Sequence, residues 1–172
     1  TAVKKDDFDS NFSPLENQYL QVIIDPETGN LSSIFDKINH REVLGKAGGN
    51  LLQFWEDEGQ YWDAWNINPN YADRPVSEVV MTCLRMLEWG EVRSVVRVEW
   101  QFRSSHFSQD YILERESPVL KIATRVDWQE RHIFVKAAFP LNLSAEFATY
   151  EIACGAIARP TQPQPPAERA KG

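Results

Sequence analysis

The chain of 172 residues has little of several features that would assign it to common functional classes. It lacks a basic excess: its net charge is −7 at pH 7, whereas proteins that bind nucleic acid need a positive surface to neutralise phosphates. The same charge argues against an anionic membrane surface as a partner. It also lacks the run of about 18 apolar residues that a membrane-spanning helix requires. The sequence therefore predicts neither a nucleic-acid partner nor a membrane partner.

Cysteine and histidine are scarce as well. The two cysteines, Cys83 and Cys154, form no C-x-x-C motif and are too few for a disulfide framework. We expect two buried thiols in a reducing compartment, with a Cys83–Cys154 bridge as the alternative. The histidines, His40, His106 and His132, lie far apart without H-x-H or H-x-x-x-H spacing, so the sequence predicts no metal site.

Motifs for nucleophilic catalysis and phosphate binding are also missing. No G-x-S-x-G is present, and neither cysteine has a histidine nearby in the sequence. The glycines of "KAGGN" (46–50) lack the spacing of a phosphate-binding loop. We therefore expect no catalytic residues from these classes.

What the sequence does contain is alternation of apolar and polar residues with a period of two. "YLQVIID" (19–25) alternates, "PETGN" supplies turn residues, and "LSSIFD" follows, which predicts a β-hairpin with positive φ at Gly29. The one modest helix-turn candidate is "DKINHREVLGKA" (36–47). Longer alternating runs form two pairs, hinged at Gly90 and at Ser117–Pro118: 76–90 with 91–102, and 108–116 with 119–129.

Long strands joined by tight turns predict an all-β fold, a large antiparallel β-sandwich, because one sheet cannot bury both of its own faces. We divide the chain into an N-terminal lead-in (1–14), a β-sandwich domain (15–159) and a Pro-rich tail (160–172). The tail has no apolar pattern and is expected to be extended or mobile.

The stretch "NLLQFWEDEGQYWDAWNINPNYADRP" (50–75) combines three tryptophans with several acids. Glycoside hydrolysis needs two carboxylates, and a turn could place Asp57 opposite Asp63. Adjacent acids in a turn are more often a solvated loop, however, and aromatic residues on strands are more often core. A carboxylate between large aromatics suits a rim better than a core, where Asp63 could accept hydrogen bonds from hydroxyls beside a tryptophan face.

Three stretches together resemble α-mannosidases of glycoside hydrolase family 38, especially the cytosolic and bacterial type. They are "GNLLQFWEDEGQYWDAWNINPNY" with its Y-W-D-A-W run, "LENQYLQVIIDPETGNLSSIFDKINHREVL" (15–44), and "VDWQERHIFVKAAFPLNLSAEFATYEIACGAIARPT" (126–161). The resemblance implies a truncated sandwich of the galactose-mutarotase-like kind and a parent enzyme that hydrolyses α-mannosides with retention. It also implies that the zinc, the nucleophile and the general acid lie in an upstream catalytic barrel, so that this segment holds no metal or other cofactor and is inactive alone.

Within that resemblance we expect the 54–65 loop to face a mannose-containing saccharide. Asp63 and Trp65 are the predicted contacts, Trp62 their packing support, and Asp57 a further candidate. Arg159 is a weaker candidate for a rim contact, whose alternative role is a salt bridge to Glu151 or a neighbour. The expected location is cytoplasmic. Two other hypotheses stay open: a standalone carbohydrate-binding module, and a purely structural oligomerisation domain.

Overall fold

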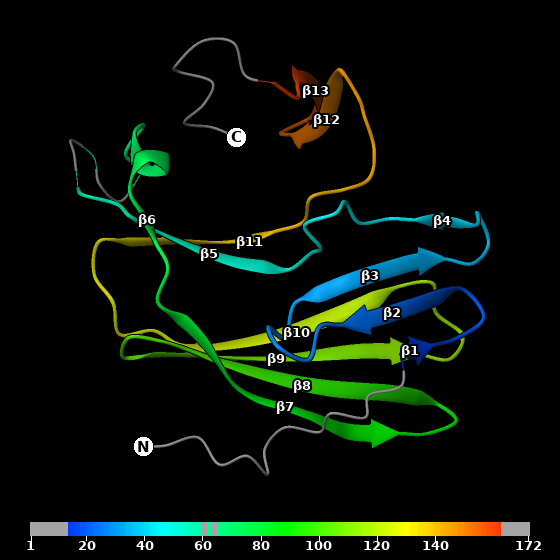
Figure 1. Ribbon diagram of the computed structural model, residues 1–172. Helices are drawn as coiled ribbons and strands as arrows, with labels where there is room; N and C mark the ends of the chain where they lie inside the picture. The colour runs from blue at the N-terminus through cyan, green and yellow to red at the C-terminus, as the bar shows by residue number, and fades with distance from the viewer. Residues whose placement is uncertain (1–13, 60–61, 63–64, 163–172) are drawn as a thin grey trace. The chain divides into compact units, whose positions relative to one another are not determined.

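A computed structural model describes residues 14–59, 62 and 65–162, and these residues form strands almost throughout (Figure 1). Their one helical element is a short 3₁₀ turn, η2 (Tyr71–Asp73). The strands, in chain order, are β1 (Leu15–Glu16), β2 (Leu20–Ile24), β3 (Leu31–Asp36), β4 (Arg41–Glu42), β5 (Leu51–Glu56), β6 (Pro75–Val76), β7 (Val79–Trp89), β8 (Arg93–Phe102), β9 (Ser105–Glu114), β10 (Leu120–Asp127), β11 (Ile133–Ala138), β12 (Phe147–Ile152) and β13 (Gly155–Pro160).

The chain divides into two compact units. The first contains the described residues of 1–53, 77–131 and 135–142, and the second those of 54–76, 132–134 and 143–172. The first unit holds a four-stranded sheet in the order β10-β9-β8-β7 and another in the order β1-β2-β3-β4. The hairpin β12–β13 belongs to the second unit, and a three-stranded sheet in the order β11-β5-β6 includes the strands at which the division falls.

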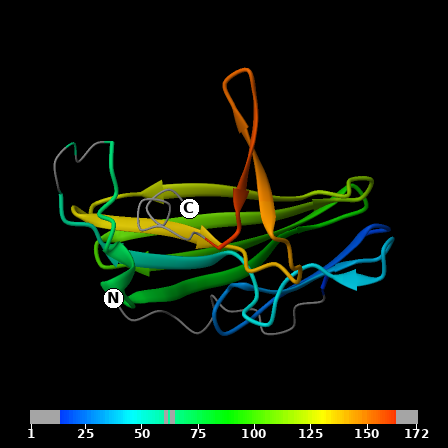
Figure 2. The same cartoon turned by 90° about the horizontal axis from the view of Figure 1, so that it is seen from above.

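The large sheet of the first unit supplies most of the core. Its strands are long and antiparallel, as Figures 1 and 2 show, and successive side chains point to opposite faces. One face is almost wholly apolar on the two central strands and is buried. Its members on β8 and β9 are Val96, Val98, Trp100, Phe102, Phe107, Tyr111 and Leu113. The period-two pattern of 91–102 and 108–116 therefore has its cause in one buried sheet face.

The smaller sheet, β1 to β4, covers this face at two points. Asn17, before β2, donates its amide hydrogens to the backbone carbonyls of Glu114 (2.7 Å) and Ser117 (2.8 Å). At the other end, the turn between β2 and β3 lies on β8, where the Trp100 indole N–H donates to the Thr28 carbonyl at 3.0 Å. The predicted all-β, antiparallel sandwich is confirmed.

Gly29 has the positive φ that the hairpin predicts, at 73°. A Cβ at this position would lie 2.4 Å from Val98 Cγ1 and 2.8 Å from Met81 Sδ, which is too close for any side chain. The close approach of the turn to the large sheet therefore depends on glycine.

A polar network is buried beneath the same turn. The Tyr111 hydroxyl donates to the Gly29 carbonyl at 3.1 Å and accepts from the Asn50 amide at 2.6 Å. The Asn50 amide also donates to Gln109 Oε1 (2.6 Å), and Gln109 donates to Thr124 Oγ1 (3.0 Å). Burial raises the pKa of Tyr111 well above its ordinary value, so this hydroxyl keeps its proton. Each buried polar group thus has a partner, which such groups require inside a core.

The hinges predicted at Gly90 and at Ser117–Pro118 are confirmed. β7 ends at Trp89 and β8 begins at Arg93, while β9 ends at Glu114 and β10 begins at Leu120. The edge strand β7 carries two register shifts, between Met81 and Cys83 and between Met86 and Glu88. Such bulges increase local twist and make an edge less suited to pairing with another chain.

The helix-turn prediction for 36–47 is wrong, because this segment turns from β3 into β4. Asp36 pairs with Arg41 across the turn, and the Asp36 carboxylate accepts the backbone N–H groups of Ile38 and Asn39, each at 3.0 Å. An aspartate that binds the backbone two and three residues ahead favours a turn over a helix.

The cysteines form no bridge. Neither Cys83 nor Cys154 is part of a disulfide, so the disulfide alternative is wrong. Cys83 is buried as expected, whereas Cys154 is exposed at the turn between β12 and β13, which contradicts the expectation that both are buried. Residues 1–13 of the predicted lead-in and residues 163–172 of the predicted tail lie outside the described residues. The expectation that the tail is extended or mobile therefore stays a prediction.

Replacing Gly29 by alanine tests the contact between the two sheets. Because the new methyl group would overlap Val98 in a left-handed backbone conformation, we expect a loss of about 3 kcal/mol in the free energy of unfolding. Urea denaturation followed by circular dichroism measures it. The control is Gly90→Ala, where the nearest atom to the new Cβ is Arg93 O at an ordinary 3.5 Å; equal losses in the two variants would contradict the role of Gly29.

A second prediction concerns the outer face of the large sheet, where Arg97 and Asp110 form a two-pronged ion pair at 2.7 and 2.8 Å. The hydrogen bonds from Arg97 hold the pKa of Asp110 below its ordinary value. The stability that this pair contributes is therefore complete above about pH 4, the unfolded pKa, and is lost as pH falls through the lower folded pKa.

Asp110→Asn is thus expected to cost about 2 kcal/mol at pH 7 and much less near pH 2, measured by urea denaturation at both values. Glu91→Gln, at an exposed turn position, is the control and should change little at either pH. A cost for Asp110→Asn that does not change with pH would contradict the assignment.

Candidate functional site

The loop from 57 to 74, in the second unit, contains most of the residues that the sequence singles out. Its two ends are joined at the base, where the Glu56 N–H donates to the Arg74 carbonyl at 3.0 Å. Arg74 also forms an ion pair with Glu58 at 2.7 Å, although both side chains are well exposed and such a pair adds little stability. The backbone therefore holds the loop closed where it leaves the sheet.

An aromatic cluster lies under this base. Trp55 on β5 and Tyr71 in η2 pack at right angles with 5.4 Å between ring centres. The ring centre of Phe134 on β11 lies 5.1 Å from that of Tyr71 and 6.0 Å from that of Trp55. These distances are those of favourable edge-to-face and tilted ring contacts. Trp55 is thus a structural residue, and Tyr71 and Phe134 are loop supports that the sequence reasoning missed.

Asp57 braces the loop from within. Its backbone N–H donates to the His132 carbonyl at 2.8 Å, and its carboxylate accepts the backbone N–H of Asn68, also at 2.8 Å. Asn68 in turn accepts the N–H of Asn70 at 2.9 Å, which the "NPN" sequence could have indicated as an Asx turn. The carboxylate of Asp57 therefore positions the loop's own backbone.

The tip of the loop presents tryptophan. Trp62 adopts a positive φ of 65°, and its carbonyl accepts the N–H groups of Trp65 and Asn66. The side chains of Trp62 and Trp65 are 67% and 86% exposed. Asp63, the predicted rim carboxylate, lies outside the described residues, and so does its distance from Asp57. What the described part of the tip offers is two accessible aromatic side chains.

Arg159 lies on β13, in the β12–β13 hairpin. Its guanidinium carbon is 5.7 Å from the centre of the Tyr150 ring, a cation–π arrangement. Arg159 pairs with Ala148 across the hairpin, which puts it on the same face as Tyr150 and on the opposite face to Glu151. The salt bridge to Glu151 considered from sequence is therefore wrong.

The structure brings no metal-binding group together among the residues that it describes. No cluster of three His, Cys, Asp or Glu side chains is found there, and these residues do not fit the coordination that a zinc ion requires. No helix of the described residues is long and apolar enough to cross a membrane.

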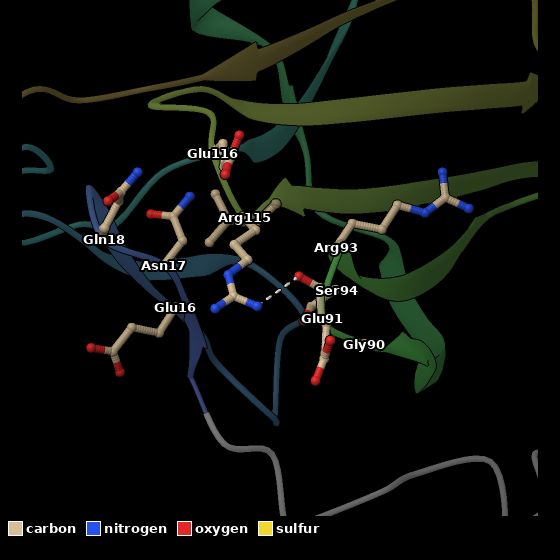
Figure 3. Close-up of a pocket in the computed structure, with 10 residues that line it drawn as sticks. Glu16, Asn17, Gln18, Gly90, Glu91, Arg93, Ser94, Arg115 and Glu116 are labelled. Atoms are coloured by element: carbon tan, nitrogen blue, oxygen red, sulfur yellow. Dashed lines mark hydrogen bonds between the residues drawn. The ribbon is translucent and has the colours of Figure 1, made fainter.

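A polar pocket that the sequence did not predict lies at one end of the sandwich in the first unit, at the turns before β2, after β7 and after β9. It has a volume of about 520 Å³ and is shown in Figure 3. The guanidinium of Arg115 points into it and donates to the Glu91 carbonyl at 3.4 Å. Asn17 and Glu116 also line it. The pocket offers hydrogen-bonding groups of both charge signs, but no aromatic ring lines it.

Comparison with known proteins complements this geometry. The sequence profile described as "Glycosyl hydrolases family 38 C-terminal domain" matches residues 15–172. The chain is 31% identical over 168 residues to "Alpha-mannosidase G" of Dictyostelium discoideum, covering 94% of this chain and 15% of that protein. It is 33% identical over 150 residues to "Alpha-mannosidase 2C1" of Homo sapiens, covering 86% of this chain and 14% of that protein. "Alpha-mannosidase" of Saccharomyces cerevisiae is 27% identical to the chain over 171 residues, and the alignment covers 86% of this chain and 15% of that protein. The chain thus spans about one seventh of these relatives.

The brace at Asp57 can be tested by hydrogen exchange. In Asp57→Ala the Asn68 N–H loses its acceptor, a loss of about 1 kcal/mol, so we expect this amide to exchange roughly fivefold faster. Asp57→Asn is the matched control, because the amide oxygen can still accept, and it should stay near the parent rate. Unchanged exchange in Asp57→Ala would show that the carboxylate does not hold the loop.

Proposed function

Because the chain belongs to the C-terminal domain family of the family 38 glycosyl hydrolases, we propose that it is a non-catalytic β-sandwich segment of an α-mannosidase. In this role it supplies one wall of the substrate cleft and a surface for packing against the other domains. The observation that carries the cleft-wall role is the loop tip, where Trp62 and Trp65 are exposed above a braced base.

The chemistry of the tip supports a sugar as its ligand. The apolar face of a pyranose ring packs on an aromatic side chain, while its hydroxyl groups need polar partners at the edge. Trp65 offers the more exposed ring, and the backbone carbonyl of Trp62 accepts the Trp65 N–H. We assign Trp65 and Asp63 to contact with a mannose-containing saccharide, and Trp62 to their support.

The base of the loop makes this assignment physically reasonable. A side chain held in place before the ligand arrives loses less conformational entropy on binding. Asp57, Trp55 and Tyr71 fix the loop by hydrogen bonding and ring packing, so Asp57 acts as a positioning residue in this proposal. Arg159, placed over Tyr150, is proposed to act at most at the rim.

The remaining parts of the reaction are assigned to residues outside this chain. The relatives are about seven times longer than the aligned region, which leaves room for a catalytic barrel as the intramolecular partner. We place there the zinc site, the nucleophile and the general acid; among the described residues of this chain, no three His, Cys, Asp or Glu side chains cluster as a zinc site would require. The absence of a disulfide between Cys83 and Cys154, both described by the structure, supports a cytoplasmic location for the parent enzyme.

The test compares Trp65→Ala with Trp89→Ala in the full-length polypeptide that carries this segment. Loss of a stacking face worth about 1.4 kcal/mol should lower kcat/KM for an α-mannoside roughly tenfold in Trp65→Ala. Trp89→Ala, an exposed tryptophan of the first unit, should have no such effect. The 172-residue chain alone should not hydrolyse an aryl α-mannoside. Turnover by this chain, or equal kinetics of the two variants, would overturn the proposal.

A second candidate, a standalone carbohydrate-binding module, draws on the same exposure of Trp62 and Trp65. Calorimetric titration of the 172-residue chain with mannose oligomers separates the two. Millimolar or tighter binding that disappears in Trp65→Ala would favour the module, because a cleft wall needs the other wall to hold its ligand.

A further inference from the structure

The strand β10 forms an open edge of the large sheet. In the part of the chain that the structure describes, β10 pairs with β9 alone, and its other side has no neighbouring strand. The residues from Ala123 to Asp127 are all exposed, in agreement with such an edge. An edge strand presents a row of backbone N–H and C=O groups that a further strand can bind. β10 therefore offers a surface for the addition of a strand.

This edge has less protection than the opposite edge of the same sheet. β7 carries two register shifts, whereas β10 pairs with β9 over its 8 residues without a shift. β10 also contains no proline, and it is longer than the usual strand of about five or six residues. A long and regular edge is a predicted site of pairing with another chain. Its charged side chains then decide which strand can bind.

The two faces of β10 restrict how a second copy of this strand can be added. Register with β9 puts Ile122, Thr124 and Val126 on the face that carries the core. Lys121 and Asp127 lie on the outer face. Because successive side chains alternate between the faces, an antiparallel copy continues both faces only where even-numbered residues meet even-numbered ones.

One such register pairs opposite charges. When Thr124 meets Thr124 of the second copy at a two-fold axis, Lys121 lies opposite Asp127 of that copy, and the axis repeats the contact. On the core face, Ile122 then lies opposite Val126 of the second copy. Val126 is 46% exposed, and an aliphatic cross-strand neighbour would cover it.

The neighbouring symmetric registers bring like charges together. A register centred on Ala123 puts Lys121 opposite Arg125 of the second copy, and one centred on Arg125 puts the two copies of this arginine against each other. Like charges directly opposite destabilise a strand pair. Registers centred nearer either end pair fewer residues of the strand and form no contact between Lys121 and Asp127. The charge sequence of β10 is therefore self-complementary in the register centred on Thr124.

Both charged groups have capacity for this contact. The Lys121 ammonium binds Glu114 of its own sheet at 2.7 Å, and both of these side chains are well exposed. One carboxylate oxygen of Asp127 accepts from the Gln129 side chain at 2.6 Å. Because an ammonium has three N–H groups and a carboxylate has two oxygens, each group can bind a second partner.

We propose that β10 pairs with β10 of a second copy of this chain, antiparallel about Thr124, and so joins the two large sheets into one continuous sheet. The charges identify a second copy as the occupant, because β10 itself supplies both members of the Lys121–Asp127 contact and a two-fold axis uses each of them. This interaction goes beyond the proposed function and makes no use of the loop tip at Trp65.

Sedimentation velocity tests the pairing in the 172-residue chain and in the full-length polypeptide that carries it. We expect a dimer in both. Lys121→Glu and Asp127→Lys should each raise the dimer dissociation constant at least about tenfold, because two attractive contacts become repulsive. An equimolar mixture of the two variants should form a heterodimer with the parent affinity, since both contacts then join opposite charges. Lys46→Glu, an equal change of charge at an exposed position, is the control and should leave the dimer intact.

Four results would overturn the inference. A monomer in both chains would show that the edge stays open. Dimerisation of the 172-residue chain but not of the full-length polypeptide would show that another strand of the parent covers β10. A dimer that Lys121→Glu does not weaken would place the interface elsewhere. Two monomeric variants that do not combine would contradict the register. The heterodimer forms only from folded chains, and none of these results depends on Trp65, so this contact and the cleft-wall role fail separately.

Discussion

The contact between the β2–β3 turn and the large sheet is the interaction on which the first unit depends. Gly29 brings its backbone against Val98 and Met81, and its carbonyl receives the hydroxyl of Tyr111. The hydroxyl is itself held by Asn50, so the apolar layer between the sheets closes around a satisfied polar centre. A buried tyrosine hydroxyl without a hydrogen-bond partner would destabilise this packing. The apolar core between the sheets therefore depends on the hydrogen bonds that Tyr111 makes.

The second unit uses local interactions for a different purpose. Its loop is held at the base by rings and backbone hydrogen bonds, while its tip leaves Trp62 and Trp65 in solvent. Rigid support beneath an exposed aromatic is the arrangement that a binding surface requires, because disorder at the base would weaken any contact at the tip. Asp57, one of the two acids considered as a carboxylate pair for glycoside hydrolysis, serves this support.

Much of the fold was predictable because a sheet with one buried face requires apolar residues at every second position of its strands. The hairpin turn at Gly29 and the breaks at Gly90 and Ser117 follow from turn chemistry that acts over a few residues. The helix-turn at 36–47 was wrong because Asp36 binds the backbone ahead of it, a local competition that apolar spacing does not show. The site was harder: the partner of Asp57, the neighbour of Tyr71 and the ring under Arg159 are contacts made by the fold, and single residues carry no sign of them.

The long separation of the contacts that join the two sheets has a consequence for biosynthesis. Tyr111 binds a carbonyl 82 residues earlier, and Asn17 binds one 100 residues later, so neither bond can form until translation has reached the later residue. Contacts between residues so far apart in the sequence form slowly compared with a hairpin. The early strands must therefore keep their apolar side chains uncovered until translation has passed Ser117. This interval is the one in which a nascent polypeptide of this type would most need a holding chaperone.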